Sequence, residues 1–288
     1  MSSGVQLRAL RHESAALGRL EHAERAPHPL LAGIVRRYCG YDHDCTGATR
    51  RREVAQDEVT IILSLGPQLR VGGPDCPSDR YASFVAALTD TFAITEHEGP
   101  LRGIEVNLSP LGAHMLFGVA MHELSAKLVL PLEDLLGAEA GELIERLACA
   151  TAWTTRFDIL DRFIVSRVER ARRPSPDVEW AWSRLRSTGG LLPVGELARE
   201  LGCSRRHLIG RFREQVGPAP KTAARLVRFQ RTVRLLERNE GGRFAEIAQR
   251  CGYYDQAHMN REFRELAGTA PGEFVARLLP DGLGVAAD

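Results

Sequence analysis

The sequence is short of lysine, of long apolar runs and of any secretory signal. Lys127 and Lys221 are its two lysines, so arginine supplies nearly all of the 38 basic side chains. No segment approaches the roughly 20 consecutive apolar residues that a membrane helix needs. Residues 1–17 lack the uninterrupted apolar core of a secretory signal. We therefore expect a cytoplasmic protein without a membrane partner.

The motifs of common catalytic sites are also absent. The sequence has no nucleophile elbow, no glycine-rich phosphate-binding loop and no H-E-x-x-H element. Its six cysteines are scattered and would be free thiols in the cytosol. The group Cys39, His43 and Cys45 matches no common zinc spacing, so we expect a polar loop there without a metal. We therefore expect a protein that is not an enzyme and holds no cofactor.

Charge is distributed unevenly along the chain. The net charge is +1, but residues 181–280 hold 18 basic and 10 acidic residues, a balance of +8. The remainder is acidic, at −7. A basic domain joined to an acidic one is typical of a module that binds a polyanion. Arginine suits this use because its guanidinium group binds phosphate and guanine in a bidentate way, although a GC-rich coding bias would also enrich arginine.

The segment Cys251–Phe274 has the pattern of the second half of a helix-turn-helix unit. Gly252 can adopt the positive φ of a tight turn, and Asp255 is a suitable N-cap for the next helix. That helix would bury an apolar stripe through Phe263 and end at Gly268. Its other face carries glutamine, asparagine and arginine, whose side chains match the edges of adenine and guanine.

The chain contains this unit twice. The earlier copy runs from Leu197 and has a turn glycine, an N-cap, a buried phenylalanine and a terminating glycine at Gly202, Ser204, Phe212 and Gly217. The later copy has the same order of features with one more residue in its turn. Two matching copies joined by a helix are far more specific than one.

Residues from about 177 to 279 resemble the paired helix-turn-helix domain of the AraC/XylS family of bacterial transcription regulators. The resemblance rests mainly on the later copy, at Ile247-Ala248, Gly252-Tyr253, Asp255, His258, Arg261, Phe263-Arg264, Gly268-Thr269 and Pro271. This sequence departs from the usual family residues at Gly210 (arginine), Ala257 (serine) and Met259 (phenylalanine).

The resemblance implies a sequence-specific DNA-binding transcription regulator. Two recognition helices, about Ser204–Val216 and Asp255–Leu266, would enter successive major grooves of one duplex. Double-stranded DNA is the expected partner. The resemblance also raises an unknown small-molecule effector at the N-terminal domain, RNA polymerase and a second copy of the chain as further partners.

The candidate DNA contacts divide into two sets. Residues expected to reach base edges are Arg205, Arg206, Ile209, Gln256, Ala257, Asn260 and Arg261. Residues expected to bind phosphate, which fixes the register without reading the sequence, are Ser204, Arg211, Arg213, Arg228 and Arg264.

The predicted fold class is α+β. Apolar, turn-bounded runs predict strands at Val59–Leu65, Leu69–Val71, Tyr81–Ala87, Thr91–Glu96 and Leu101–Leu108. They would form a small β-barrel or sandwich, which resembles the cupin-like sensor domain of many family members. Helices follow these strands. An all-α C-terminal domain then carries the two helix-turn-helix units and a linking helix from about Lys221 to Arg238.

The proline-broken segment Ala171–Pro176 gives the domain boundary. We expect a sensor or dimerisation domain at residues 1–173, with strands to about 108 and then helices. A DNA-binding domain would follow at 177–280, and a disordered tail at 281–288. Residues 1–30 are expected to be either loosely ordered or an edge strand.

Two other interpretations stay open. One is an enzyme, such as a DNA-repair-type protein with a catalytic N-terminal domain fused to a DNA-binding tail. It would need a nucleophilic cysteine or a multi-cysteine metal site, and the unpaired cysteines speak against it. The other is an interaction protein whose helix-turn-helix has lost DNA binding, which the basic balance of residues 181–280 disfavours.

Overall fold

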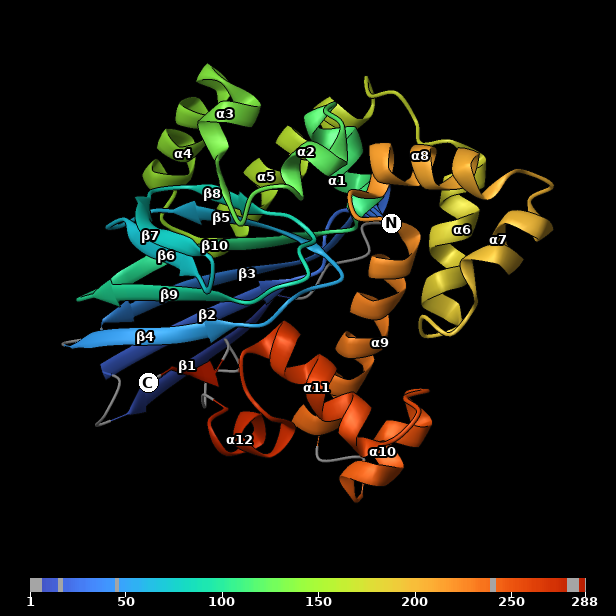
Figure 1. The fold of residues 1–288 in the computed structure, drawn as a ribbon. Coiled ribbons are helices and arrows are strands. Elements are labelled where there is room, and N and C mark those ends of the chain that lie inside the picture. Colours follow the sequence, from blue (N-terminus) through green and yellow to red (C-terminus); the bar gives the residue numbers. More distant parts are fainter. Residues whose placement is uncertain (1–6, 15–17, 45–46, 239–241, 279–284, 288) are drawn as a thin grey trace.

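The computed structural model describes residues 7–14, 18–44, 47–238, 242–278 and 285–287. Two β-sheets and a layer of helices form the N-terminal half, and a helical C-terminal half lies beside them (Figure 1). The predicted α+β class is confirmed in its sandwich form, because the two sheets are not closed into one barrel. Within the described ranges, no helix has the length and apolar character needed to cross a membrane.

The two sheets are antiparallel throughout their described pairings. In spatial order, the larger consists of β1 (Arg8–Ser14), β2 (Gly18–Arg25), β3 (Val35–Asp44), β10 (Leu101–Leu108), β5 (Val59–Ser64), β8 (Phe84–Ala86) and β11 (Leu130–Pro131). The smaller consists of β12 (Val285–Ala286), β4 (Ala48–Glu53), β9 (Ala93–Glu98), β6 (Leu69–Gly73) and β7 (Cys76–Tyr81).

A layer of helices covers the outer face of the larger sheet (Figure 1). It contains α3 (Leu132–Leu136), α4 (Ala138–Cys149) and α5 (Trp153–Val168), while the short helix η1 (Pro29–Leu31), α1 (Pro110–Phe117) and α2 (Met121–Leu124) lie toward the C-terminal half. The ring of Tyr38 stacks on Phe157. Trp153 lies so close to Gly40 that any Cβ there would clash with its ring. A buried Arg25, paired with Asp161, ties β2 to α5.

Three expectations about loops and termini need correction. Arg8–Ser14 and Gly18–Arg25 pair as the antiparallel strands β1 and β2, so the loosely ordered alternative is wrong for these residues and β1 is the edge strand. The polar loop expected at residues 39–45 is instead the end of β3, with Cys39 and His43 buried, while residues 45 and 46 lie outside the described residues. In the predicted tail, residues 281–284 and 288 also lie outside the described residues. Val285 is buried in β12, so the expected disorder is wrong there.

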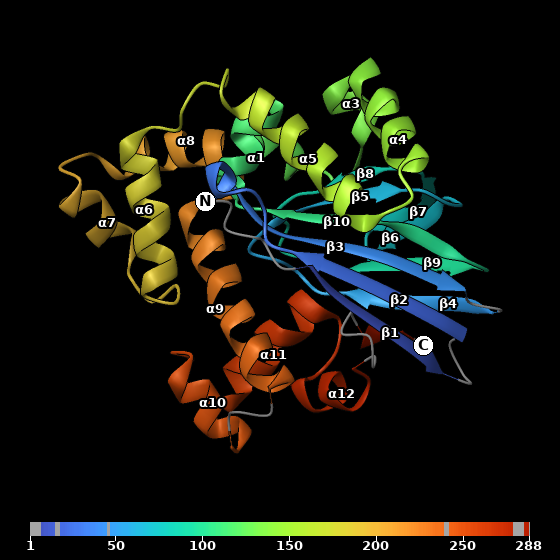
Figure 2. The ribbon, with the colours of Figure 1, turned by 180° about the vertical axis from the view of Figure 1, so that it is seen from behind.

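The C-terminal half consists of two helical bundles that share one long helix (Figure 2). The elements are α6 (Pro176–Ser187), α7 (Val194–Glu200), α8 (Arg205–Val216), α9 (Pro220–Glu237), α10 (Phe244–Arg250), α11 (Gln256–Ala267) and α12 (Pro271–Ala276). Trp182 packs against Phe212 in the first bundle. In the second, Phe263 packs against both Phe229 and Phe274. Because α9 contributes to both cores, it joins them as a rigid linking helix.

The N-terminal half touches the C-terminal ends of both α8 and α11. Helix α8 packs on α1 and α2, and Gly217 at its end leaves room for Ser125. At the end of α11, the Leu266 carbonyl accepts a hydrogen bond of 2.9 Å from the Ala55 amide. Strand β12, which follows α12, pairs with β4 of the smaller sheet. The N-terminal halves of α8 and α11 are left pointing away from the sandwich (Figure 1).

Candidate nucleic-acid interface and adjoining cavity

Helix α8 begins with a side-chain cap. The Ser204 hydroxyl accepts a hydrogen bond of 3.2 Å from the His207 amide, which satisfies a free N–H of the first turn. Leu208 and Phe212 turn into the core, so Arg205, Arg206 and the rest of the opposite face remain in solvent. Gly202, with φ of 63°, makes the turn between α7 and α8. The sequence therefore fixes both the start of the helix and the face that it exposes.

Helix α11 repeats this construction. The Asp255 carboxylate accepts a 2.7 Å hydrogen bond from the His258 amide, and Gly268 ends the helix with φ of 68°. Met259 and Phe263 are fully buried. The structure thus confirms the predicted N-caps, Ser204 and Asp255, and the predicted terminating glycines, Gly217 and Gly268.

We expect Asp255→Ala to lower the free energy of unfolding by about 1 kcal/mol, because one amide of the first turn loses its acceptor. Asp255→Asn is the matched control, since asparagine caps helices about as well as aspartate. Urea denaturation of the full chain measures both variants. Equal losses of stability in the two variants would show that the charge of Asp255, and not its hydrogen bond to the His258 amide, stabilises the helix.

The exposed faces carry most of the residues predicted to contact bases. Arg205, Arg206, Gln256, Ala257 and Arg261 are exposed, and Ile209 and Asn260 are half-buried. Of the residues predicted to bind phosphate, Ser204, Arg213 and Arg264 are exposed and Arg211 is half-buried. The Asn260 Oδ1 atom is buried and has no hydrogen-bond partner among the described residues. Helices α8 and α11, which α9 joins, therefore each present a polar face that carries exposed arginines.

The structure speaks against Arg228 as a phosphate contact. Its guanidinium group donates hydrogen bonds of 2.8 and 3.0 Å to the two carboxylate oxygens of Glu262 and lies over the Tyr253 ring. The Arg228 side chain is only 18% exposed. Burial alone would lower its pKa, but the hydrogen bonds and charge of Glu262 outweigh burial and raise the pKa. Arg228 therefore holds α9 against α11 through its pairing with Glu262.

Comparison with known proteins agrees with this geometry. A family model described as a helix-turn-helix domain matches residues 197–277. An HTH-type transcriptional regulator of Mycobacterium tuberculosis is 31% identical over 109 residues, which make up 38% of this chain and 42% of that protein. The C-terminal region therefore contains a helix-turn-helix domain. After the family that its sequence resembles, we call this region the AraC-type domain. The match spans less than half the length of the curated relative.

Solved structures share the arrangement of both halves. ToxT from Vibrio cholerae with a bound unsaturated fatty acid superposes with a TM-score of 0.51 at 14% identity, over 92% of this chain and 100% of that chain. ToxT bound to (E)-4-(8-methylnaphthalen-1-yl)but-3-enoic acid gives 0.50 at 11% identity, over 84% and 98%. At these identities the likeness shows the fold, in which a β-sheet domain precedes the AraC-type domain.

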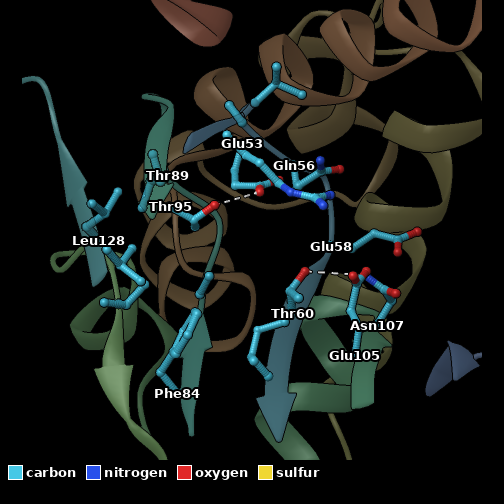
Figure 3. Close-up of a pocket in the computed structure, with 18 of the residues that line it drawn as sticks. Glu53, Gln56, Glu58, Thr60, Phe84, Thr89, Thr95, Glu105, Asn107 and Leu128 are labelled. Carbon is cyan, nitrogen blue, oxygen red and sulfur yellow. Dashed lines mark hydrogen bonds between the residues drawn. The ribbon is translucent and has the colours of Figure 1, made fainter. Parts of the chain in front are cut away.

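The sandwich contains a cavity of about 320 Å³ beside the AraC-type domain (Figure 3). The inner faces of both sheets line it, and Gln230 and Arg234 of α9 close one side. The segment Val54–Glu58, which we call the junction segment, forms part of the wall. Gln230 donates a 2.6 Å hydrogen bond to the Ala55 carbonyl. The linking helix is therefore in direct contact with the cavity wall.

The junction segment also faces the AraC-type domain through a buried carboxylate. The Asp57 side chain is 4% exposed and lies 3.9 Å from Arg186 of α6 and 4.0 Å from Arg234 of α9. Together with the bond from Ala55 to Leu266, these contacts link one short segment to α6, α9 and α11. The five residues of the junction segment thus contact helices of both helical bundles.

Sequence reasoning missed several residues of this region. Glu262 was not connected with Arg228, which lies 34 positions away in the sequence. Tyr254, which is 93% exposed beside the α11 cap, was also missed, and an exposed aromatic at a helix start is a recognisable signal. His97, which is buried, also lines the cavity. Among the described residues, no group of three His, Cys, Asp or Glu side chains could hold a metal ion.

Proposed function

We propose that this protein is a sequence-specific DNA-binding transcription regulator. Helices α8 and α11 would enter successive major grooves on one face of a duplex, about 34 Å apart from centre to centre. The observation that carries the proposal is the pair of capped helices with exposed arginine-bearing faces, rigidly joined by α9. Their N-terminal halves are unobstructed by the sandwich, and such ends are the ones that contact base edges in helix-turn-helix proteins (Figure 1).

The proposal assigns roles to residues and domains. Base contacts come from Arg205, Arg206, Ile209, Gln256, Ala257, Asn260 and Arg261. Phosphate contacts come from Ser204, Arg211, Arg213 and Arg264. Residues 1–173 act as the sensor domain and 177–280 as the DNA-binding domain. A regulator of this kind also acts on RNA polymerase, and a homodimer would double the number of bases read.

A small molecule in the cavity would modulate DNA binding. The ToxT structures contain a fatty acid and a butenoic acid derivative, and this chain shares their fold. Here the junction segment connects the cavity to both helix-turn-helix units. Occupancy that displaces this segment would move α9, and α8 and α11 with it, and so change the fit of the two helices to successive grooves.

Competition electrophoresis with the full chain tests the function. We expect the DNA upstream of the protein's own gene to be retained in the presence of a large excess of shuffled DNA of the same composition. Equal competition by both DNAs would contradict sequence-specific binding. No retention of either DNA would favour the interaction-protein alternative.

Arg261→Ala is expected to cost about 1–3 kcal/mol on the true operator and to relax the preference at one base pair. The side chain is exposed on the α11 face opposite the core, where it can reach a guanine edge. Arg264→Ala is the matched control on the same helix, and it should weaken binding to all sequences alike. Selection from a randomised operator library measures both. An unchanged base preference in Arg261→Ala would remove Arg261 from the base contacts.

A further inference from the structure

Tyr254 differs from the other four tyrosines of the chain in its surroundings. Each of the others packs its ring against a phenylalanine or histidine ring: Tyr38, Tyr41, Tyr81 and Tyr253. Tyr254 is 93% exposed, and its side chain has no ring contact or hydrogen bond within the parts of the chain that the structure describes. The packing of the fold therefore gives no reason for a large aromatic side chain at this position.

The place of Tyr254 in the sequence of the helix makes this exposure informative. Asp255 is the N-cap of α11, so Tyr254 is the residue directly before the cap. A large apolar side chain there commonly packs on the fourth residue of the helix, which is Met259 here, and so fixes the entry of the chain. Met259 is fully buried while Tyr254 lies in solvent, so this contact is not made. The Tyr254 side chain is therefore available to a partner outside the chain.

The backbone of Tyr254 is held in place although its side chain is exposed. The Tyr254 amide donates a hydrogen bond of 3.3 Å to the Nδ1 atom of His258. The His258 ring packs edge-on against Tyr253, with 5.4 Å between the ring centroids, and Tyr253 is buried beneath the Arg228 guanidinium group. A side chain that starts from a fixed backbone loses less conformational freedom when it binds a partner.

In the proposed complex, Tyr254 lies at the edge of the second major groove. The N-terminal half of α11 points away from the sandwich (Figure 1). A helix with its side chains is about 10–12 Å across and the groove is about 12 Å wide, so α11 would fill the groove. The chain that leads into α11 then has to pass one of the two sugar-phosphate backbones that form the walls. A residue directly before the cap is therefore placed at a wall, and not at the base edges.

We propose that the Tyr254 hydroxyl donates a hydrogen bond to a phosphate oxygen at this wall and so fixes the position of α11 in the groove. A phenol hydroxyl is a hydrogen-bond donor, and tyrosine is among the side chains that hold DNA by its phosphates. Because the side chain is neutral, this contact adds affinity without the release of a counterion that accompanies an arginine contact. The inference rests on the proposed function for the docking of α11.

The first test removes the hydroxyl oxygen alone. Tyr254→Phe is expected to weaken binding of the full chain about tenfold, on the upstream DNA and on shuffled DNA alike, because one hydrogen bond to a charged group is lost. The slope of log K against log salt should stay unchanged, whereas Arg264→Ala should reduce it by about one. Fluorescence anisotropy with labelled duplexes measures both quantities.

Tyr81→Phe is the matched control for the substitution. It removes the same oxygen atom from β7 of the smaller sheet, and it should bind both DNAs as the wild type does. The melting temperature of Tyr254→Phe should equal that of the wild type, because the Tyr254 hydroxyl has no partner within the described chain. Unchanged affinity, a smaller salt slope or an altered base preference in Tyr254→Phe would each overturn the proposed contact.

The second test locates the phosphate. Ethylation of single phosphates in the upstream DNA should weaken wild-type binding at one phosphate beside the α11 groove. Tyr254→Phe should be insensitive to ethylation at that phosphate, since both changes remove the same interaction, and should stay sensitive at the phosphates bound by arginine. Identical patterns of interference for the wild type and Tyr254→Phe would overturn the contact.

The comparison of upstream with shuffled DNA separates this inference from the proposed function. Preferential binding of upstream DNA that Tyr254→Phe leaves unchanged would overturn the Tyr254 contact and leave the regulator function in place. Equal binding of both DNAs, weakened about tenfold in Tyr254→Phe, would overturn the regulator function and leave the contact in place. Binding of neither DNA would overturn both.

Discussion

Replacing Glu262 with glutamine is expected to lower the free energy of unfolding by about 2–4 kcal/mol, because it leaves two partly buried guanidinium groups without their shared carboxylate. Glu262 is 7% exposed and lies 2.8 Å from Arg228 and 3.1 Å from Arg225. The second helix-turn-helix unit should lose the stability, because Glu262, Arg225 and Arg228 hold α9 against α11. Urea denaturation followed by circular dichroism measures it.

Glu265→Gln is the matched control for this loss. Glu265 also pairs with Arg225, but its side chain is 54% exposed. An exposed pair contributes roughly 0–1 kcal/mol, so the control should be close to wild type. A Glu262→Gln protein as stable as the control would show that the buried cluster is replaceable and that apolar packing alone fixes α11.

Affinity for DNA is expected to fall about 500-fold between about 50 and 200 mM salt, if five phosphates are neutralised and log K falls with log salt at a slope of about −4.5. The five exposed arginines of α8 and α11 are Arg205, Arg206, Arg213, Arg261 and Arg264. None of them contacts a carboxylate within the parts of the chain that the structure describes. Fluorescence anisotropy with a labelled duplex at four salt concentrations gives the slope.

The arginines of α9 are expected to add little to this salt dependence. Arg225 and Arg228 are neutralised by glutamates of α11, so they release no counterions when DNA binds. Arg213→Ala should reduce the slope by about one, and Arg228→Ala should leave it unchanged in protein that remains folded. An affinity indifferent to salt would exclude the electrostatic part of the interface.

The helix-turn-helix units could be predicted from sequence because their signals are local. Ser204 and Asp255 cap the amides three residues on, and Gly202 and Gly252 sit in turns that need positive φ. Each of these features is decided within one turn of helix. Strand β10 was likewise predicted with its observed bounds, because an apolar run between turn residues marks it.

The cavity and the α9–α11 cluster could not be predicted in the same way. Strand β3 was missed because its inward side chains include Cys39 and His43, which resemble a polar loop when taken alone. Only the opposing sheet explains why such residues are buried. The pairing of Arg228 with Glu262 was missed because the two residues lie 34 positions apart and meet through tertiary packing. Pairing at such separations leaves no periodic signal in a single sequence.

The pairing of β12 with β4 has a mechanical consequence for the DNA-binding region. The chain joins that region to the sandwich at both of its ends, through residues 169–175 before α6 and through β12 after α12. Ala55 and Asp57 add contacts to α6, α9 and α11. A movement of the DNA-binding region that keeps both chain connections is therefore more restricted than the movement of a domain held by a single linker.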